Sequence, residues 1–309
     1  MNAVWSFWSK PYLDARKSIW CSEKQHLLSW ILSLQQARKF FGRTVLFTDD
    51  YGARMLVDGL QLEFDVVSTA LDSLSNHDSK WWAAGKIYTY SAQNEPFIHI
   101  DNDVFLWKPL PVNSDTGLFA QNPEYFDVGA SFYMPEQIES LINKYGGWLP
   151  KEWIWYRSSG LPQRAESCGV FGGGNTEFIN YYAKLALEMI EHAANAKIWT
   201  TLGEQVERNI LVEQYLLSAC IEHYKNHQNG CDQSVDIYYL FNSMDDAFDP
   251  RKAADAGYTH LIADTKKNKA LAKDLERRVE KDYPEAFEKC LRYDGRNMKP
   301  RRLDLLSGA

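Results

Sequence analysis

The first hundred residues alternate between short apolar runs and segments with the periodicity of an amphipathic helix. Such alternation is typical of a parallel β-sheet covered by helices on both faces. We therefore expect an α/β fold with a doubly wound, mainly parallel sheet. In chain order, the expected elements are an apolar run at 3–8, a helix at 22–42, a strand at 44–50, a short helix at 51–60, a strand at 64–69, a helix at 80–93 and a strand that begins at residue 97.

The second half of the chain mixes both kinds of element. Strands are expected at 117–122, 168–173, 235–241 and 257–263, and helices at 176–195, 203–224 and 266–292. Because no long linker or repeat divides the chain, we expect one large domain at 1–265, with a basic helical extension at 266–309 packed on it.

Composition narrows the classes of protein that the chain can belong to. A net charge of −7 argues against general nucleic-acid binding. The excess of Lys and Arg after residue 264 could contact a membrane surface, but we expect a solvated helix there. The five cysteines form no Cys-x-x-Cys pair, and the sequence has neither a signal-peptide pattern nor a long apolar span. We therefore expect free thiols in a cytoplasmic protein.

Two aspartates, Asp101 and Asp103, follow an apolar strand and are separated only by Asn102. Side chains alternate along a strand, so both carboxylates should point to the same side. Like charges so close raise each other's pKa unless a cation lies between them, and oxygen ligands favour Mg²⁺ or Mn²⁺. Ligands of open α/β sheets bind at the carboxyl ends of the strands, where this pair falls. The sequence therefore predicts a divalent-metal site, with a third ligand from elsewhere.

The segment that carries the pair, PFIHIDNDVFLWKPLP, resembles the metal-binding segment of GT-A glycosyltransferases. Downstream, HLIADTKKN resembles the His-x-x-Gly-x-x-Lys segment of the glycogenin-like and bacterial galactosyltransferase group, carbohydrate-active family 8. The chain departs from that pattern at Ala263, where glycine is usual. The resemblance implies a metal site of Asp101, Asp103 and His260, and a diphosphate contact from Lys266.

Two more segments resemble the same group, in the same order along the chain. SCGVFGGGNTEFINYY resembles its Asn-[Ser/Ala]-Gly-Val-x-x-x-Asn segment, which implies that Ser167 and Cys168 line the donor sugar. ILVEQYLL carries Glu213 and Gln214 where the group often has Asp-Gln near the anomeric carbon, which makes them the catalytic candidates. The alternative for this pair is a polar position on a helix surface. The four segments span residues 97–267.

Together these segments imply a GT-A, Rossmann-like fold and a metal-dependent hexosyltransferase that uses a nucleotide sugar, expected to be a UDP-sugar, with retention of configuration. Lys86 is a second candidate for the diphosphate, and Asn102 lies within the metal loop. The nucleoside is expected near Ser6, Trp8 and Asp49, at the ends of the first two strands. An inverting enzyme of the same fold stays open; it would need a base, and the candidates are Glu213, Glu166 and Asp127.

Three other classes of protein compete with this interpretation. A nucleotidyltransferase would carry a glycine-rich basic loop after its first strand, which residues 6–14 lack. A glycosidase needs its two carboxylates farther apart than two residues on one strand face allow. A catalytically weak carbohydrate- or nucleotide-binding protein stays open, although the intact set of metal-ligand candidates argues against it.

The acceptor, which could be a saccharide, a lipid-linked sugar or a peptide, is expected against residues 146–164. This stretch contains Trp148, Trp153 and Trp155, and its glycines and prolines are typical of a loop. Aromatic rings stack on the apolar faces of ligands, and specificity commonly resides in loops. The alternative is that these tryptophans pack a small subdomain.

Overall fold

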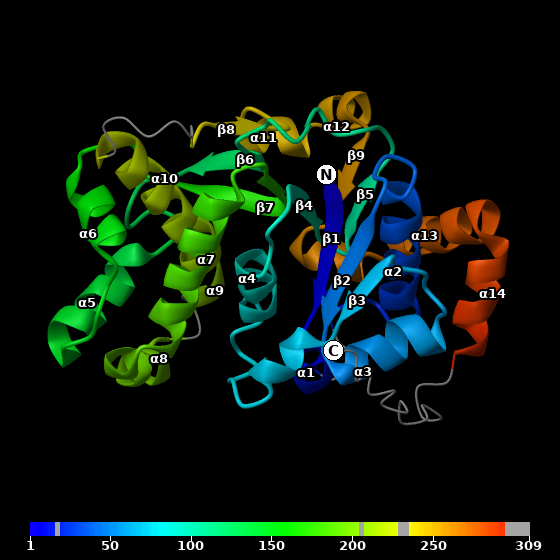
Figure 1. Cartoon of the computed structure of the whole chain (residues 1–309), viewed down its shortest axis with the longest axis horizontal. Helices are drawn as coiled ribbons and strands as arrows, with labels where there is room; N and C mark the ends of the chain where they lie inside the picture. The colour runs from blue at the N-terminus through cyan, green and yellow to red at the C-terminus, as the bar shows by residue number, and fades with distance from the viewer. Residues whose placement is uncertain (16–18, 204–206, 228–234, 294–309) are drawn as a thin grey trace, which may run out of the picture.

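A computed structural model describes residues 1–15, 19–203, 207–227 and 235–293. Its centre is a seven-stranded sheet (Figure 1). In spatial order the strands are β3 (Val66–Ser68), β2 (Thr44–Thr48), β1 (Asn2–Phe7), β4 (Phe97–Ile100), β7 (Arg164–Gly173), β6 (Leu118–Tyr125) and β8 (Ile237–Tyr239). Two further strands, β5 (Val104–Leu106) and β9 (Tyr258–His260), form a separate antiparallel pair.

Every described strand of the main sheet except β7 runs in the same direction. β1 pairs in parallel with β2 and β4, and β2 pairs in parallel with β3. β7 is antiparallel to both β4 and β6, and β8 is parallel to β6. The expected α/β class, with a mainly parallel sheet flanked by helices, is therefore confirmed.

Alternate residues of the central strands face two separate apolar cores. Val4 and Phe97 lie in the first core, whereas Trp5 and Ile98 lie in the second, and all four are fully buried. This is the alternation expected of strands that are covered on both faces. The first core lies under α4 (Ala84–Ser91), α7 (Thr176–Glu191) and α10 (Leu216–His227). The second lies under α2 (Glu23–Ala37), α13 (Lys269–Asp282) and α14 (Pro284–Arg292) (Figure 1).

Shorter helical segments connect these layers. Ser22 takes the expected N-cap position of α2, which ends at Ala37, before the expected stop at Gly42. The other segments are α1 (Ser9–Asp14), α3 (Asp50–Ala53), η1 (Arg54–Gly59), η2 (Ala70–Leu74), α5 (Pro135–Tyr145), α6 (Lys151–Ser158), η3 (Ala193–Asn195), α8 (Ala196–Thr201), α9 (Arg208–Ile210), η4 (Leu211–Tyr215), α11 (Met244–Phe248), α12 (Pro250–Ala256) and η5 (Ala263–Lys267).

The basic C-terminal segment, expected as one helix over 266–292, forms two helices. Lys266 lies in the short turn η5, and α13 begins after Asn268, whose side chain accepts hydrogen bonds from the first backbone N–H groups. A break falls before Pro284, because proline lacks the N–H that a helix interior needs and fits the first turn of α14. α13 packs against α2, and residues 294–309 lie outside the described residues.

The expectation that residues 146–164 form a loop is wrong. Helix α6 occupies the middle of the stretch, and Pro150 stands at its N-cap position, where a missing N–H removes no helical hydrogen bond. Trp153 is fully buried and packs edge-on against Tyr215, with 4.7 Å between ring centres. Trp155 is partly buried against the same core. Trp153 therefore stabilises the fold, as the alternative interpretation held.

The described cysteines form no disulfide. Cys21, Cys168, Cys220 and Cys290 carry free thiols, and Cys231 lies outside the described residues. Three of these four thiols are buried, and Cys21 is exposed. Among the described helices, none is both long enough and apolar enough to cross a bilayer.

Candidate metal centre and adjoining cleft

The pairing of β5 with β9 brings two distant parts of the chain together. Asp101 and Asp103 lie between the end of β4 and the start of β5, while His260 ends β9. In the register of the pair, His260 lies opposite Val104, next to Asp103. One ligand atom from each of Asp101, Asp103 and His260 lies within 4.8 Å of the others. The three residues that the sequence predicts as metal ligands therefore form one cluster.

Asp103 is buried, and the ammonium group of Lys266 is paired with one of its carboxylate oxygens. Its Oδ2 lies 2.5 Å from Lys266 Nζ, and its Oδ1 lies 3.5 Å from His260 Nε2. Burial alone would raise the pKa of Asp103, but Lys266 and His260 hold it well below its usual range. Oδ1 is enclosed and has no hydrogen-bond partner among the described residues. Such an atom is costly in a folded protein unless a ligand completes the site.

His260 is oriented by a buried amide that the sequence analysis did not identify. His260 Nδ1 lies 2.8 Å from Gln121 Oε1, which also accepts a hydrogen bond from the Tyr258 hydroxyl at 2.7 Å. A carboxamide oxygen can only accept, so Nδ1 carries the proton and the lone pair of Nε2 points towards Asp103. Metal-binding histidines are commonly fixed in this way through their second nitrogen.

Asp101 forms the other half of the cluster together with a buried lysine. Lys86 Nζ lies 2.9 Å from the Asp101 carboxylate, 2.9 Å from Glu213 Oε1 and 2.7 Å from the backbone oxygen of Cys168. Burial alone would lower the pKa of Lys86, but the two carboxylates raise it, so the ammonium stays charged. The pKa of Asp101 is raised to about 6, because burial and the neighbouring Asp103 outweigh Lys86.

The donor set of this cluster fits a divalent cation. Carboxylates suit Mg²⁺ and Mn²⁺, and the imidazole nitrogen extends the set towards the transition metals. Asp103 Oδ1 and His260 Nε2 are directed at each other without a close contact, at 3.5 Å. Asp101, Asp103 and His260 could therefore hold a metal ion.

Gly169 on β7 leaves the space that His260 needs. A Cβ atom at this position would lie 2.4 Å from Gln121 Oε1 and 2.5 Å from His260 Nδ1. Gly169 belongs to the SCGVFGGG segment, so one glycine of that motif serves the metal centre by its lack of a side chain.

We expect Gly169→Ala to weaken Mn²⁺ binding by about 10–100-fold, the range found when a residue that orients a metal ligand is disturbed. The added methyl group must displace Gln121, His260 or both. Titration calorimetry with Mn²⁺ measures the change, and Gly42→Ala is the control, because a Cβ there meets nothing within 4 Å. Unchanged Mn²⁺ affinity in a folded Gly169→Ala variant would remove His260 from the ligand set.

Ala263 has a backbone conformation that glycine adopts more easily, which accounts for the glycine that is usual at this position of the His-x-x-Gly-x-x-Lys segment. Its φ is +48°, in the left-handed region that L-residues other than glycine seldom adopt. Ala263 follows β9 and starts the turn η5, which brings Lys266 to Asp103. The chain therefore keeps the backbone geometry of the motif without its glycine.

Ala263→Gly should raise the free energy of unfolding by roughly 0.5–1 kcal/mol, because relief of the left-handed strain exceeds the extra entropy that glycine loses on folding. Urea denaturation is the measurement. The matched control, Ala254→Gly within helix α12, should have the opposite sign, since glycine is a poor residue in a helix interior. A loss of stability at both positions would contradict the argument.

The residues predicted to lie near the nucleoside are bound into the fold. Asp49 caps α3 through Gly52 N–H at 2.8 Å and also accepts hydrogen bonds from both the backbone N–H and the hydroxyl of Ser9. Trp8 is buried in the first core. Ser6 Oγ lies 2.9 Å from the ring of His99, which in turn lies 3.6 Å from Asp101. Ser6 is thus linked to Asp101 through the ring of His99.

Asn102 and the donor-sugar candidates are also placed around the cluster. Asn102 Nδ2 donates to Ser29 Oγ at 3.0 Å, which anchors the loop between the two aspartates to α2. Ser167 and Cys168 are buried on β7, and Cys168 contributes its backbone oxygen to Lys86. Burial raises the pKa of the Cys168 thiol, so this side chain is an unreactive packing group.

Glu213 and Gln214 lie in η4, and the helix-surface alternative is wrong for Glu213. Its side chain is fully buried, and its Oε2 has no hydrogen-bond partner in the described part of the chain. Gln214 Oε1 lies 2.6 Å from the hydroxyl of Tyr133. The two neighbouring residues therefore contact different parts of the fold. Glu213 is paired with Lys86 of α4, and Gln214 contacts Tyr133, which follows β6.

Glu166, a candidate base, is enclosed by its partners. It lies 2.9 Å from Arg164, 2.9 Å from the Ser218 hydroxyl and 2.8 Å from the Tyr239 hydroxyl, and it is fully buried. These contacts give it a structural role between β7, α10 and β8. Asp127, another candidate base, instead lines an open cleft.

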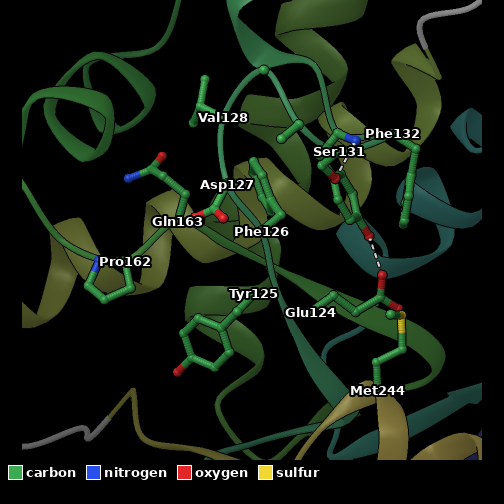
Figure 2. Close-up of a pocket in the computed structure, with 13 residues that line it drawn as sticks. Glu124, Tyr125, Phe126, Asp127, Val128, Ser131, Phe132, Pro162, Gln163 and Met244 are labelled. Carbon is green, nitrogen blue, oxygen red and sulfur yellow. Dashed lines mark hydrogen bonds between the residues drawn. The ribbon is translucent and has the colours of Figure 1, made fainter.

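This cleft, formed by residues 124–133 with Pro162, Gln163 and Met244, has a volume of about 980 Å³ (Figure 2). Glu124, at the end of β6, lies 2.8 Å from the Tyr133 hydroxyl. Burial raises the pKa of Glu124, although hydrogen bonds from Tyr133 and Ser167 oppose the rise. Glu124 and Tyr133 could not be predicted from the sequence, because they belong to no motif and only the fold brings them close to Gln214.

Fold and site together define an α/β protein with a candidate metal centre of two aspartates and one histidine. The chain belongs to the DUF6734 family, described as a family of unknown function, whose profile matches residues 1–293. A comparison with curated proteins gives no match.

Several solved structures are similar to this chain at low identity. The glycosyltransferase GlyE from Streptococcus pneumoniae TIGR4 has a TM-score of 0.43 and 10% identity, over 94% of this chain and 62% of GlyE. The galactosyltransferase LgtC, in complex with donor and acceptor sugar analogs, has a TM-score of 0.37 and 13% identity, over 93% of this chain and 95% of LgtC. The PaToxG glycosyltransferase has a TM-score of 0.37 and 11% identity, over 96% of this chain and 85% of PaToxG. The chain thus spans less than two thirds of the length of GlyE.

Proposed function

We propose that the chain is a metal-dependent glycosyltransferase that moves a sugar from a UDP-sugar to an acceptor hydroxyl with retention of configuration. The observation that carries the proposal is the cluster of Asp101, Asp103 and His260, with Lys266 paired to Asp103. Cleavage of a nucleotide sugar leaves a charged diphosphate, so the site must neutralise negative charge as the bond breaks. A divalent cation held by the two aspartates and His260 would supply the positive charge for that task, beside the ammonium group of Lys266.

Each residue of the cluster then has a chemical role. A divalent cation held by Asp101, Asp103 and His260 would supply Lewis-acid stabilisation of the leaving diphosphate. Lys266 would add a point charge to the same group, since its ammonium already lies at the cluster. Lys86 would keep Asp101 and Glu213 in place, because it bonds both carboxylates.

The proposed reaction exchanges one bond at the anomeric carbon. The bond from this carbon to the diphosphate oxygen breaks, and the acceptor hydroxyl oxygen bonds to the same face of the carbon. The hydroxyl proton passes to the departing diphosphate, so the step needs no base from the protein.

The ion pairs of the two buried candidate bases favour retention over an inversion that would use them. An inverting enzyme needs a free carboxylate to take the acceptor proton. Glu213 is ion-paired with Lys86 at 2.9 Å, and Glu166 is ion-paired with Arg164 at 2.9 Å. A carboxylate that is ion-paired with a cation is a weaker proton acceptor than a free one, so inversion through Glu213 or Glu166 is disfavoured. The exposed Asp127, which lines the cleft, is the base that an inverting reaction would use.

The remaining assignments belong to the same proposal. Gln214 and the Glu213 Oε2, which has no partner among the described residues, would contact the transferred sugar together with Ser167. The buried Cys168 would support this wall through its backbone oxygen, which accepts from Lys86. The nucleoside would lie near Ser6, with Trp8, Asp49 and Asn102 supporting that wall from within the fold. We also propose that 1–265 forms the transferase domain and that an extension begins at residue 266, whose helices α13 and α14 pack on it.

The test is release of UDP from UDP-glucose, UDP-galactose and UDP-N-acetylglucosamine by the full chain with Mn²⁺, with GDP-mannose as the comparison donor. We expect slow hydrolysis of at least one UDP-sugar, loss of turnover with EDTA and recovery when Mn²⁺ is returned. Calorimetry with UDP and GDP in the presence of Mn²⁺ gives an independent readout. Tighter binding of GDP would overturn the assigned nucleotide, and turnover that persists in EDTA would overturn the metal.

A further inference from the structure

We infer that the cleft formed by residues 124–133 with Gln163 binds the acceptor, and that the acceptor is a saccharide. This inference rests on the proposed function, because it names the second substrate of the same site. It replaces the expectation that the tryptophans of residues 146–164 form the acceptor wall, since Trp153 is fully buried.

Contacts at the inner end of the cleft join it to the donor side of the site. Glu124, which lines the cleft, lies 2.8 Å from the Tyr133 hydroxyl, and that hydroxyl lies 2.6 Å from Gln214 Oε1. Ser167, on β7, also hydrogen-bonds with Glu124. A hydroxyl group bound at Glu124 would therefore lie beside the residues proposed to hold the transferred sugar.

The walls of the cleft carry exposed aromatic rings. Tyr125 is 62% exposed and Phe132 is 51% exposed, values that are high for such large apolar side chains. The ring of Phe126 is held in place because it stacks on the ring of Tyr133, with 4.9 Å between the ring centres. Rings held in this way offer flat apolar surfaces that the C–H faces of a pyranose can cover.

Polar groups between these rings match the hydroxyls of a sugar. Glu124 and Asp127 line the cleft together with Tyr125 and Phe132, and their carboxylates are drawn in Figure 2. The amide of Gln163 is instead bound within the fold, where its Oε1 accepts from the Tyr215 hydroxyl at 2.7 Å. Two carboxylates disfavour a phosphorylated or otherwise anionic ligand, and they are poor neighbours for a lipid tail. A neutral polyhydroxylated ligand satisfies both the rings and the carboxylates. The volume of about 980 Å³ is sufficient for an oligosaccharide end.

The experiment measures saccharide binding directly, by titration calorimetry and saturation-transfer NMR on the full chain with UDP and Mn²⁺ present. The probes are lactose, cellobiose and N,N′-diacetylchitobiose. We expect saturable binding of at least one of them, and at least a ten-fold loss of affinity in Tyr125→Ala and in Phe132→Ala. Tyr238→Ala is the matched control, because Tyr238 is 57% exposed on β8 and does not line the cleft.

The outcomes separate this inference from the proposed function. Binding of a disaccharide that both cleft variants lose and Tyr238→Ala keeps supports the inference, even if no UDP-sugar is turned over. If UDP and Mn²⁺ bind but none of the three disaccharides does, the saccharide assignment is overturned while the proposed transferase stands. Saccharide binding that is equally strong in all three variants overturns the cleft as the acceptor site.

Discussion

Replacing Asp103 with asparagine is expected to lower UDP-sugar turnover by about a thousand-fold, which corresponds to roughly 4 kcal/mol of lost transition-state stabilisation. The amide side chain would keep the shape of the carboxylate but remove the charge that Lys266 and His260 face at 2.5 Å and 3.5 Å. Asp103 also carries an unpartnered buried oxygen among the described atoms. We therefore expect Mn²⁺ binding, followed by electron paramagnetic resonance, to fall together with turnover.

The control for this variant is Asp264→Asn, in the same turn as Lys266. The side chain of Asp264 is 95% exposed and pairs with Lys267, so the substitution makes the same chemical change outside the cluster. Both readouts should stay near wild type in this control. If Asp103→Asn kept Mn²⁺ binding and turnover, the metal centre would not include Asp103.

The second large effect is expected when Lys86 is replaced, and it is a loss of folding stability. Lys86→Met should lower the free energy of unfolding by about 3–5 kcal/mol, because it leaves two buried carboxylates without their shared cation. Asp101 and Glu213 each lie 2.9 Å from the ammonium that the substitution removes. Urea denaturation measures the loss, and a fall in the melting temperature of about 10 °C should accompany it.

Two companion variants show whether the loss arises from uncompensated charge. Lys86→Met combined with Glu213→Gln should recover part of the stability, since one of the two stranded charges is then removed. Lys252→Met breaks a surface ion pair with Asp246 and should change stability little. A double variant as unstable as the sum of its two single variants would show that packing, and not charge, is responsible.

The sequence predicts the strands and the longer helices of the first hundred residues because their periodicity is strong and their ends are marked. β4 is a clear example, since its four buried residues are followed directly by Asp101. The short segments α1 and η2 are not predicted. The cluster of Asp101, Asp103 and His260 could also be predicted, because its members lie in segments that resemble those of a known group. His260 is a ligand candidate by that resemblance alone, as nothing local distinguishes it from a structural histidine.

Other features depend on long-range contacts that no local pattern records. β7 has the composition of a buried strand whichever way it runs, so its antiparallel direction follows only from its pairing with β4 and β6. Gln121 and Glu124 lie in and near the end of an ordinary apolar strand, and they gain their roles from His260 and Tyr133. Pro150 and Pro162 lead to the prediction of a loop around α6. A helix nevertheless forms, because Pro150 stands at the N-cap position, where a helix tolerates proline.

The pairing of β5 with β9 also sets the order in which the site is made. During synthesis from the N-terminus, Asp101 and Asp103 leave the ribosome long before His260, and β5 has no partner until β9 follows. A nascent chain can build the strands β1, β2 and β4 early, but it carries only two of the three clustered residues. The complete cluster therefore arises only after β9 and His260 have been synthesised and have paired with β5.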